Sequence, residues 1–152
     1  MSVVKVKDKQ AEGYDVSTVE AWIDEYVEGL VAPFEWTRLE GGHSNITYQL
    51  QDAAGKKAVI RRPPLGELLP GAHDMRREWE LISCLGPPGF PVPAALGFCA
   101  DKDVTGAFFY VMGFIEGHPL YNSTQTLERI PLEKRVILAH SFFKRYSFKC
   151  LR

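Results

Sequence analysis

The sequence predicts an α+β fold in which a helix precedes three strands, and a second helix precedes two more. Apolar residues recur at helical spacing in two separate segments, and runs that alternate with a period of two follow each segment. With 152 residues, of which 45% are hydrophobic, the chain is long enough to bury one sizeable core. We therefore expect an antiparallel sheet of about five strands with packed helices.

The first helix is expected over residues 15–30. Ser17 and Glu20, three residues apart, form a capping-box pattern near its start. We expect one face of this helix to pack against the core. Its apolar residues recur at the spacing of such a face: Val19, Trp22, Ile23, Tyr26, Val27 and Leu30.

Three short strands are expected next, over residues 36–40, 47–52 and 57–62, where the apolar period changes to two. The residues Ala-Ala-Gly-Lys at 53–56 supply a turn between the second and third strands. Two consecutive prolines at 63–64 end the third strand, because proline has no N–H to donate to a sheet. Together these segments predict a three-stranded antiparallel meander.

A second helix follows a loop. Asp74 can cap its first turn, and Gly86 with Pro87 stops it. Two further strands are expected within residues 91–100 and 106–117. The second of these is almost continuously apolar, which is typical of a strand buried on both faces.

The last part of the chain differs in its residue pattern. We expect a polar loop over residues 121–125 and then a helix from about Pro131, since proline suits the first helical turn. One apolar stripe would run along this helix, through Leu132, Val136, Ala139 and Phe143.

Composition excludes several classes of function. Eighteen basic and nineteen acidic residues give a net charge of −1, so we expect neither nucleic acid nor a membrane surface as a partner. The four histidines form no H-E-x-x-H pattern and the three cysteines no C-x-x-C pair, so we expect no metal site. No stretch approaches the ~20 apolar residues of a membrane span. An odd number of widely spaced cysteines is typical of reduced thiols, and we expect a cytoplasmic protein.

Two glycines between the first two strands are the first candidate for a ligand-binding site. Gly41 and Gly42 allow the backbone to approach a ligand closely, and Ser44 with Asn45 could add donors for phosphate oxygens. A glycine pair on its own is also typical of a simple turn.

Two charged residues further along strengthen this interpretation. Arg61 ends an apolar strand, where a cation can hold the phosphates of a nucleotide, and Glu78 on the next helix is placed to pair with it. Taken singly, Arg61 could be a solvated strand end and Glu78 a surface position. A glycine-rich strand turn, a strand cation and a helix carboxylate, in that order, are the first three parts of a kinase nucleotide lobe.

Several stretches also resemble a known family. The segments GGHSNITYQL, AVIRRPPLGELLPGAHDMRREWELISCL, GFPVPAALGFCAD and GAFFYVMGFIEGHPL closely resemble the N-terminal part of the aminoglycoside phosphotransferase family. They are nearest to the branch whose kinase-like domain also occurs fused to acyl-CoA dehydrogenases. The resemblance covers about residues 34–120. It implies a protein-kinase-like N-lobe with an incomplete helical C-lobe.

Domain limits follow from this resemblance. We expect an N-terminal extension with a helix over residues 1–33, a nucleotide-binding N-lobe over 34–116, and the start of a C-lobe with an atypical tail over 117–152. The family also implies ATP as cofactor, with Mg²⁺ in the complete domain, and a small-molecule acceptor that carries a hydroxyl.

The resemblance assigns roles to particular residues. Arg61 stands in the place of the kinase lysine, with Glu78 as its helix partner; arginine keeps the charge but replaces a point charge by a planar fork, and it looks usual in this branch. Gly113 departs from relatives, which tend to carry glutamate there. The nucleotide-positioning loop would be Gly41, Gly42, His43, Ser44 and Asn45, and the adenine-reading hinge would be Met112, Gly113, Phe114 and Ile115.

Two catalytic motifs of the family are missing. The HGD....N loop and the later magnesium aspartate are absent, His140 is followed by Ser-Phe-Phe, and no aspartate occurs after Asp103. A truncated product, a splice form or a shifted reading frame would explain the divergent tail. We therefore expect no catalytic residues and no phosphoryl transfer by this chain alone.

A non-catalytic, pseudokinase-like binding or interaction module is the alternative function. In that case an apolar face around Phe109, Val111 and residues 132–143, exposed toward the missing lobe, could support self-association. A nucleic-acid binder that uses the basic tail is disfavoured by the net charge.

Overall fold

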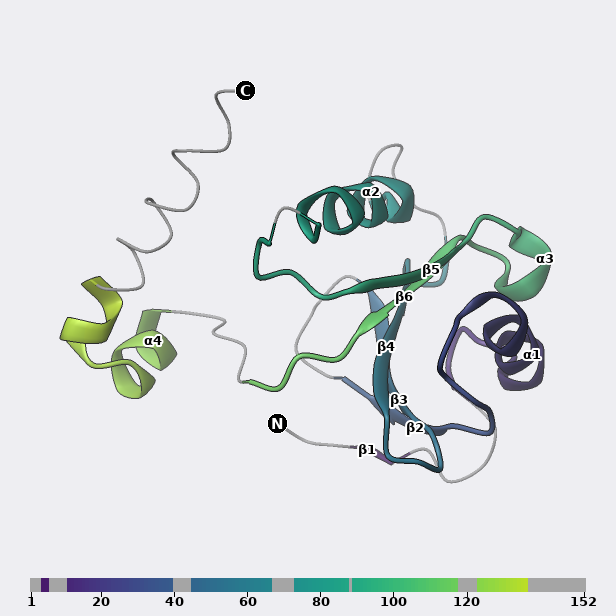
Figure 1. Ribbon diagram of the computed structural model, residues 1–152, viewed down its shortest axis with the longest axis horizontal. Helices are drawn as coiled ribbons and strands as arrows, with labels where there is room; N and C mark the ends of the chain where they lie inside the picture. The colour runs from purple at the N-terminus through teal and green to yellow at the C-terminus, as the bar shows by residue number, and fades with distance from the viewer. Residues whose placement is uncertain are drawn as a thin grey trace. The chain divides into compact units, whose positions relative to one another are not determined.

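The computed structural model describes residues 4–5, 11–39, 45–66, 73–87, 89–117 and 123–136. The chain divides into two compact units, residues 1–115 and 116–152. The described residues of the first unit form a six-stranded antiparallel sheet in the order β1-β2-β3-β4-β6-β5, with three helices (Figure 1). The strands are β1 Val4–Lys5, β2 Glu35–Arg38, β3 Ile46–Gln51, β4 Lys57–Arg62, β5 Ala95–Cys99 and β6 Phe109–Gly113, and the helices are α1 Val16–Tyr26, α2 Met75–Leu85 and α3 Lys102–Thr105.

The predicted meander is confirmed in β2, β3 and β4, which pair in sequence order. The turn between β3 and β4 is closed by Asp52, whose side chain accepts the N–H of Lys56 at 2.8 Å. Gly55 takes a φ of +83° in this turn, a conformation that favours glycine. The strand β4 ends at Arg62, directly before the two prolines, as expected.

The first helix is confirmed and starts at Asp15 as predicted, but the predicted capping box and the predicted end at residue 30 were wrong. Asp15, not Ser17, is the N-cap residue, and its side chain accepts the N–H of Thr18 at 3.0 Å. Glu20 takes no part in a capping box; its carboxylate accepts from the N–H of Phe34 and the Nε1–H of Trp36, each at 3.1 Å. The helix ends at Tyr26 because the backbone becomes extended at Val27.

The main hydrophobic core lies between α1 and one face of the sheet. Val19 and Ile23 of α1 are fully buried, and Tyr14 before the helix packs its ring near Trp36, Tyr48 and Phe109. Tyr26, predicted to lie on the packing face, is 58% exposed. The sheet residues of this core are Trp36, Ile46, Tyr48, Leu50, Ala58, Ile60, Cys99, Phe109 and Val111.

The helix α2 packs against the opposite face. Asp74 caps it as predicted, accepting the N–H of Arg77 at 3.1 Å, and the helix ends at Gly86. Trp79 stacks on Phe98 of β5 with ring centroids 5.9 Å apart. Since successive strand residues point to opposite faces, Phe98 contacts α2 while its neighbour Gly97 lies against α1.

The expected exposure of Phe109 and Val111 was wrong. Both are 0% exposed, because β6 is an inner strand of the sheet and α1 covers the face to which these side chains point. The prediction of a strand buried on both faces is confirmed, since Tyr110 on the other face is 3% exposed.

The second unit is described only over residues 116–117 and 123–136. It contains α4, Ser123–Arg129, and a further helical segment over residues 132–136. The expected polar loop is therefore wrong from Ser123 onward, whereas the helix predicted from Pro131 is present as far as Val136. Ala139 and Phe143 of its predicted stripe lie outside the described residues.

Candidate functional site

The predicted partners Arg61 and Glu78 meet on the α2 face of the sheet. The Arg61 Nε lies 3.2 Å from the Glu78 Oε2, and each side chain is about one-third exposed, at 32% and 31%. The pairing follows from local structure. Arg61 alternates away from the α1 core on β4, and the Asp74 cap fixes the start of α2, so that Glu78 falls in its first turn.

The Arg61 Nε–H is not fully used by this ion pair. The atom is buried but makes no hydrogen bond with acceptable geometry, although the Glu78 oxygen is within ion-pair distance. The contact is thus an attraction between charges without a directed hydrogen bond. About one-third of the Arg61 side chain is exposed, and this part is the one that a phosphate oxygen could contact.

Glu78 accepts from two further side chains. The Tyr110 hydroxyl donates to Glu78 Oε2 at 2.9 Å, and the Asn45 amide donates to Glu78 Oε1 at 3.2 Å. Burial, together with the neighbouring carboxylate, raises the pKa of Tyr110 well above its ordinary value. Sequence reasoning missed Tyr110, although strand alternation places it on the same face as Met112, two residues later.

Asn45 is the part of the predicted nucleotide loop that the structure describes. Besides its contact with Glu78, its Oδ1 lies 2.7 Å from the Nδ1 of His73, just before α2. The loop is thus fastened at one end to the helix that carries Glu78. Gly41, Gly42, His43 and Ser44 lie outside the described residues, and their predicted role stays a prediction.

The predicted hinge lies at the end of β6. Met112 pairs with Val59 of β4, and the N–H of Gly113 donates to the Ala94 carbonyl at 2.8 Å. That N–H is therefore already occupied. Phe114 lies under the Lys57 ammonium at 5.3 Å, and Ile115 is 58% exposed. The division between the two compact units falls directly after Ile115.

Strand register joins the hinge and the ion pair into one surface. Thr47 pairs with Arg61, which pairs with Tyr110; Gln49 pairs with Val59, which pairs with Met112. Paired residues share a face, so a cation and polar groups at one end adjoin apolar side chains at the hinge end. This arrangement fits a nucleotide, whose phosphates are anionic and whose base has an apolar surface.

The described residues contain no group of three or more histidine, cysteine or carboxylate side chains that could hold a metal ion. In the same part of the chain, no helix is long and apolar enough to cross a bilayer.

Comparisons with known proteins identify a family and several relatives of this chain. The profile of the Phosphotransferase enzyme family, APH, matches residues 35–144. The chain is 36% identical over 108 residues to acyl-CoA dehydrogenase family member 11 of Homo sapiens, a match that covers 68% of the chain and 14% of the relative. It is 35% identical over 100 residues to acyl-CoA dehydrogenase family member 10 of Mus musculus, covering 62% of the chain and 9% of the relative.

One solved structure is similar in fold as well as sequence. It is a crystal structure from Ralstonia eutropha JMP134, described as a "putative aminoglycoside phosphotransferase", with a TM-score of 0.58 and 31% sequence identity. The match covers 72% of this chain and 30% of the neighbour. The chain therefore spans about a third or less of each of these proteins.

Proposed function

The chain belongs to the phosphotransferase enzyme family, and on that premise we propose that it forms the ATP-binding N-lobe of a small-molecule kinase. The observation that carries the proposal is the Arg61–Glu78 pair. It lies on the sheet face to which Tyr110 and Met112 of the hinge strand β6 also point. A strand cation held by a helix carboxylate is the arrangement that positions the α- and β-phosphates in kinases.

Each residue of the surface takes a defined part in this proposal. Arg61 holds phosphate oxygens through the exposed part of its guanidinium, while Glu78 fixes its position. The predicted nucleotide loop, residues 41–45, would supply N–H groups to the phosphates in this proposal. Phe114 and Ile115 present the remaining hinge backbone groups to the adenine edge, since the Gly113 N–H is bound to Ala94 and Met112 is paired with strands on both sides.

We further propose that this chain alone binds nucleotide without transferring its phosphoryl group. Transfer requires a residue that orients the acceptor hydroxyl and oxygen ligands for Mg²⁺. The sequence supplies neither family motif, and no aspartate follows Asp103. In the complete family domain the acceptor would be a hydroxyl of a small molecule. A cytoplasmic location suits the free thiols of Cys84 and Cys99.

A titration of the 152-residue chain with ATP and Mg²⁺, followed by calorimetry, tests the proposal. We expect saturable binding that Arg61→Ala weakens by about tenfold or more, because the phosphates lose their cation. The control is Arg77→Ala, which removes an exposed cation from α2 outside the proposed surface and should leave the affinity unchanged.

Absence of saturable binding at millimolar ATP, with a folded chain by circular dichroism, would contradict nucleotide binding. That result would favour the alternative, a non-catalytic interaction module. Equal weakening by Arg61→Ala and Arg77→Ala would also count against the assigned surface, because it would indicate a general charge effect.

A further inference from the structure

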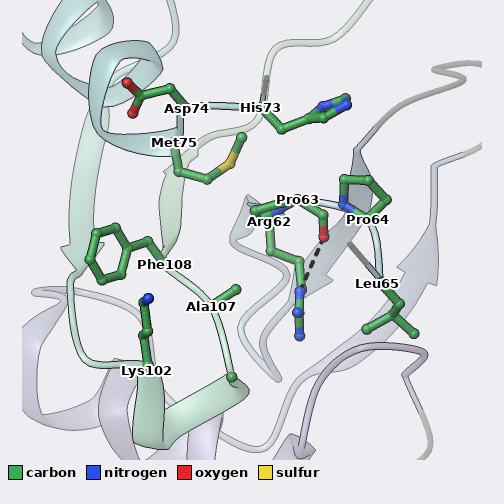
Figure 2. Close-up of a pocket in the computed structure, with 12 residues that line it drawn as sticks. Arg62, Pro63, Pro64, Leu65, His73, Asp74, Met75, Lys102, Ala107 and Phe108 are labelled. Carbon is green, nitrogen blue, oxygen red and sulfur yellow. Dashed lines mark hydrogen bonds between the residues drawn. The ribbon is translucent and has the colours of Figure 1, made fainter. Parts of the chain in front are cut away.

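A cavity of about 660 Å³ lies where the end of β4, the start of α2 and the connection from α3 to β6 come together (Figure 2). It contains neither Arg61 nor Glu78 of the proposed nucleotide surface, but it adjoins that surface at His73, which lines the cavity and contacts Asn45. Arg62 lines the cavity, whereas its neighbour Arg61 points to the opposite face of the sheet. The volume is within the range of about 300–1,000 Å³ that is typical of small-molecule pockets.

Arg62 brings a buried positive charge to this cavity. It is 5% exposed, and its Nε and Nη1 donate to three backbone carbonyls, those of Pro63, Gly13 and Thr105. Among the described residues no carboxylate pairs with it. Three of its five N–H groups are thus used, and the two on Nη2 have no acceptor in the described part of the chain.

A second cation lines the same cavity. Lys102 lies over the ring of Phe108, with its Nζ 5.6 Å from the ring centroid. Asp74 also lines the cavity, but its carboxylate caps α2 by accepting from Arg77 and is directed away from Arg62 in Figure 2. The side chains that face the cavity therefore carry an excess of positive charge.

The remaining lining is mostly apolar. Met75 is 2% exposed, and Figure 2 shows its thioether directed toward the Arg62 and Pro63 side of the cavity. Leu65, Ala107 and the Phe108 ring complete the apolar wall. Such a wall favours the burial of an apolar ligand group. Burial of a doubly charged phosphate would cost more free energy, because two negative charges would need compensation.

We propose that this cavity binds a small organic carboxylate, with its anionic group toward Arg62 and Lys102 and its apolar body against Met75 and Phe108. A single negative charge matches the free N–H groups of Arg62 and the nearby ammonium. Neither Arg61 nor Glu78 lines the cavity, so the carboxylate binds without nucleotide present.

The test uses hexanoate and its uncharged counterpart hexanamide, each titrated into the full 152-residue chain and followed by ¹⁵N and aromatic NMR shifts. We expect saturable hexanoate binding with shifts at residues 102–108, and hexanamide binding at least about tenfold weaker. Lys102→Gln should weaken hexanoate binding about fivefold, because it removes one of the two cations.

Two further variants test the cavity without removing a cation from it and control for a general effect of charge. Ala107→Leu fills the cavity and should abolish the shifts, while Arg77→Gln removes an exposed cation outside the cavity and should leave them unchanged. The proposal is overturned by equal affinity for hexanoate and hexanamide, by no saturable binding, or by binding that Lys102→Gln and Ala107→Leu both leave intact.

Discussion

Glu78 joins three elements through a single carboxylate. Arg61 of β4, Tyr110 of β6 and Asn45 at the start of β3 all direct polar atoms to it. A carboxylate with several donors is held in one position, and it holds the donors in turn. Strand alternation sets the face to which Arg61 points, and Glu78 holds its side chain on that face.

We expect Glu78→Ala to lower the free energy of unfolding by about 1–3 kcal/mol, since it leaves a partly buried guanidinium and two neutral donors without their acceptor. Urea unfolding followed by tryptophan fluorescence measures the change. The control is Glu80→Ala, an exposed position on the same helix that should cost little. Equal effects of the two substitutions would show that the contacts of Glu78 contribute nothing to stability.

The helix α1 has two candidate N-cap residues in its sequence, and only one of them caps it. Ser17 and Glu20 have the spacing of a capping box, but Asp15 has the better local acceptor and caps the helix. Glu20 instead bonds Phe34 and Trp36, fourteen and sixteen residues away. These long-range hydrogen bonds of Glu20 cannot be read from the local sequence. The predicted cap, Ser17, was therefore two residues too late.

We expect Asp15→Ala to lower the thermal midpoint of unfolding more than Ser17→Ala does, because only Asp15 accepts the N–H of Thr18. Hydrogen bonds from Ser17 and Thr18 lower the pKa of Asp15 below its ordinary value. A lowered folded-state pKa means that this contribution is present above about pH 4 and is lost as the pH falls through the folded-state pKa.

Thermal unfolding between neutral pH and pH 2 measures this dependence. Asp15→Asn keeps a capping side chain without a titrating group, so its midpoint should fall less steeply with acid than that of the parent chain. Identical acid profiles for the parent chain and Asp15→Asn would exclude a contribution from the Asp15 carboxylate.

Across the whole molecule, the sequence predicted the elements better than their packing. The meander and the Asp74 cap follow from alternation, prolines and short-range capping, all of which act over a few residues. The two-residue strand β1, which pairs Val4 with Arg38, has no such signal. Nor did the pattern show that α1 covers Phe109 and Val111, because one apolar stripe does not specify its partner.

The Arg61–Glu78 contact was predictable because a motif fixes the order of its parts. Tyr110 and His73 were not identified, although they bond to Glu78 and Asn45, because their roles arise only when β6 and the start of α2 lie beside each other. Their contacts are long-range and carry no spacing of their own.

The close packing at Gly97 allows a test of whether α1 and the sheet unfold as one body. At Gly97 of β5, an added Cβ would lie 2.8 Å from the Val27 Cγ2 and 3.1 Å from the Trp22 Cη2, so Gly97→Ala forces these packed side chains to shift. We expect a loss of about 1–3 kcal/mol in the free energy of unfolding. Gly113→Ala is the control, because its added Cβ would lie 3.4 Å from the nearest atom, an ordinary contact with Ala94.

Urea unfolding with amide hydrogen exchange distinguishes the two possibilities. If α1 belongs to the cooperative unit, protection in α1 and in β4 falls together in Gly97→Ala, since both open only when the shared core opens. Loss of protection confined to α1, with β4 unchanged, would show instead that the helix docks on a lobe that is stable without it.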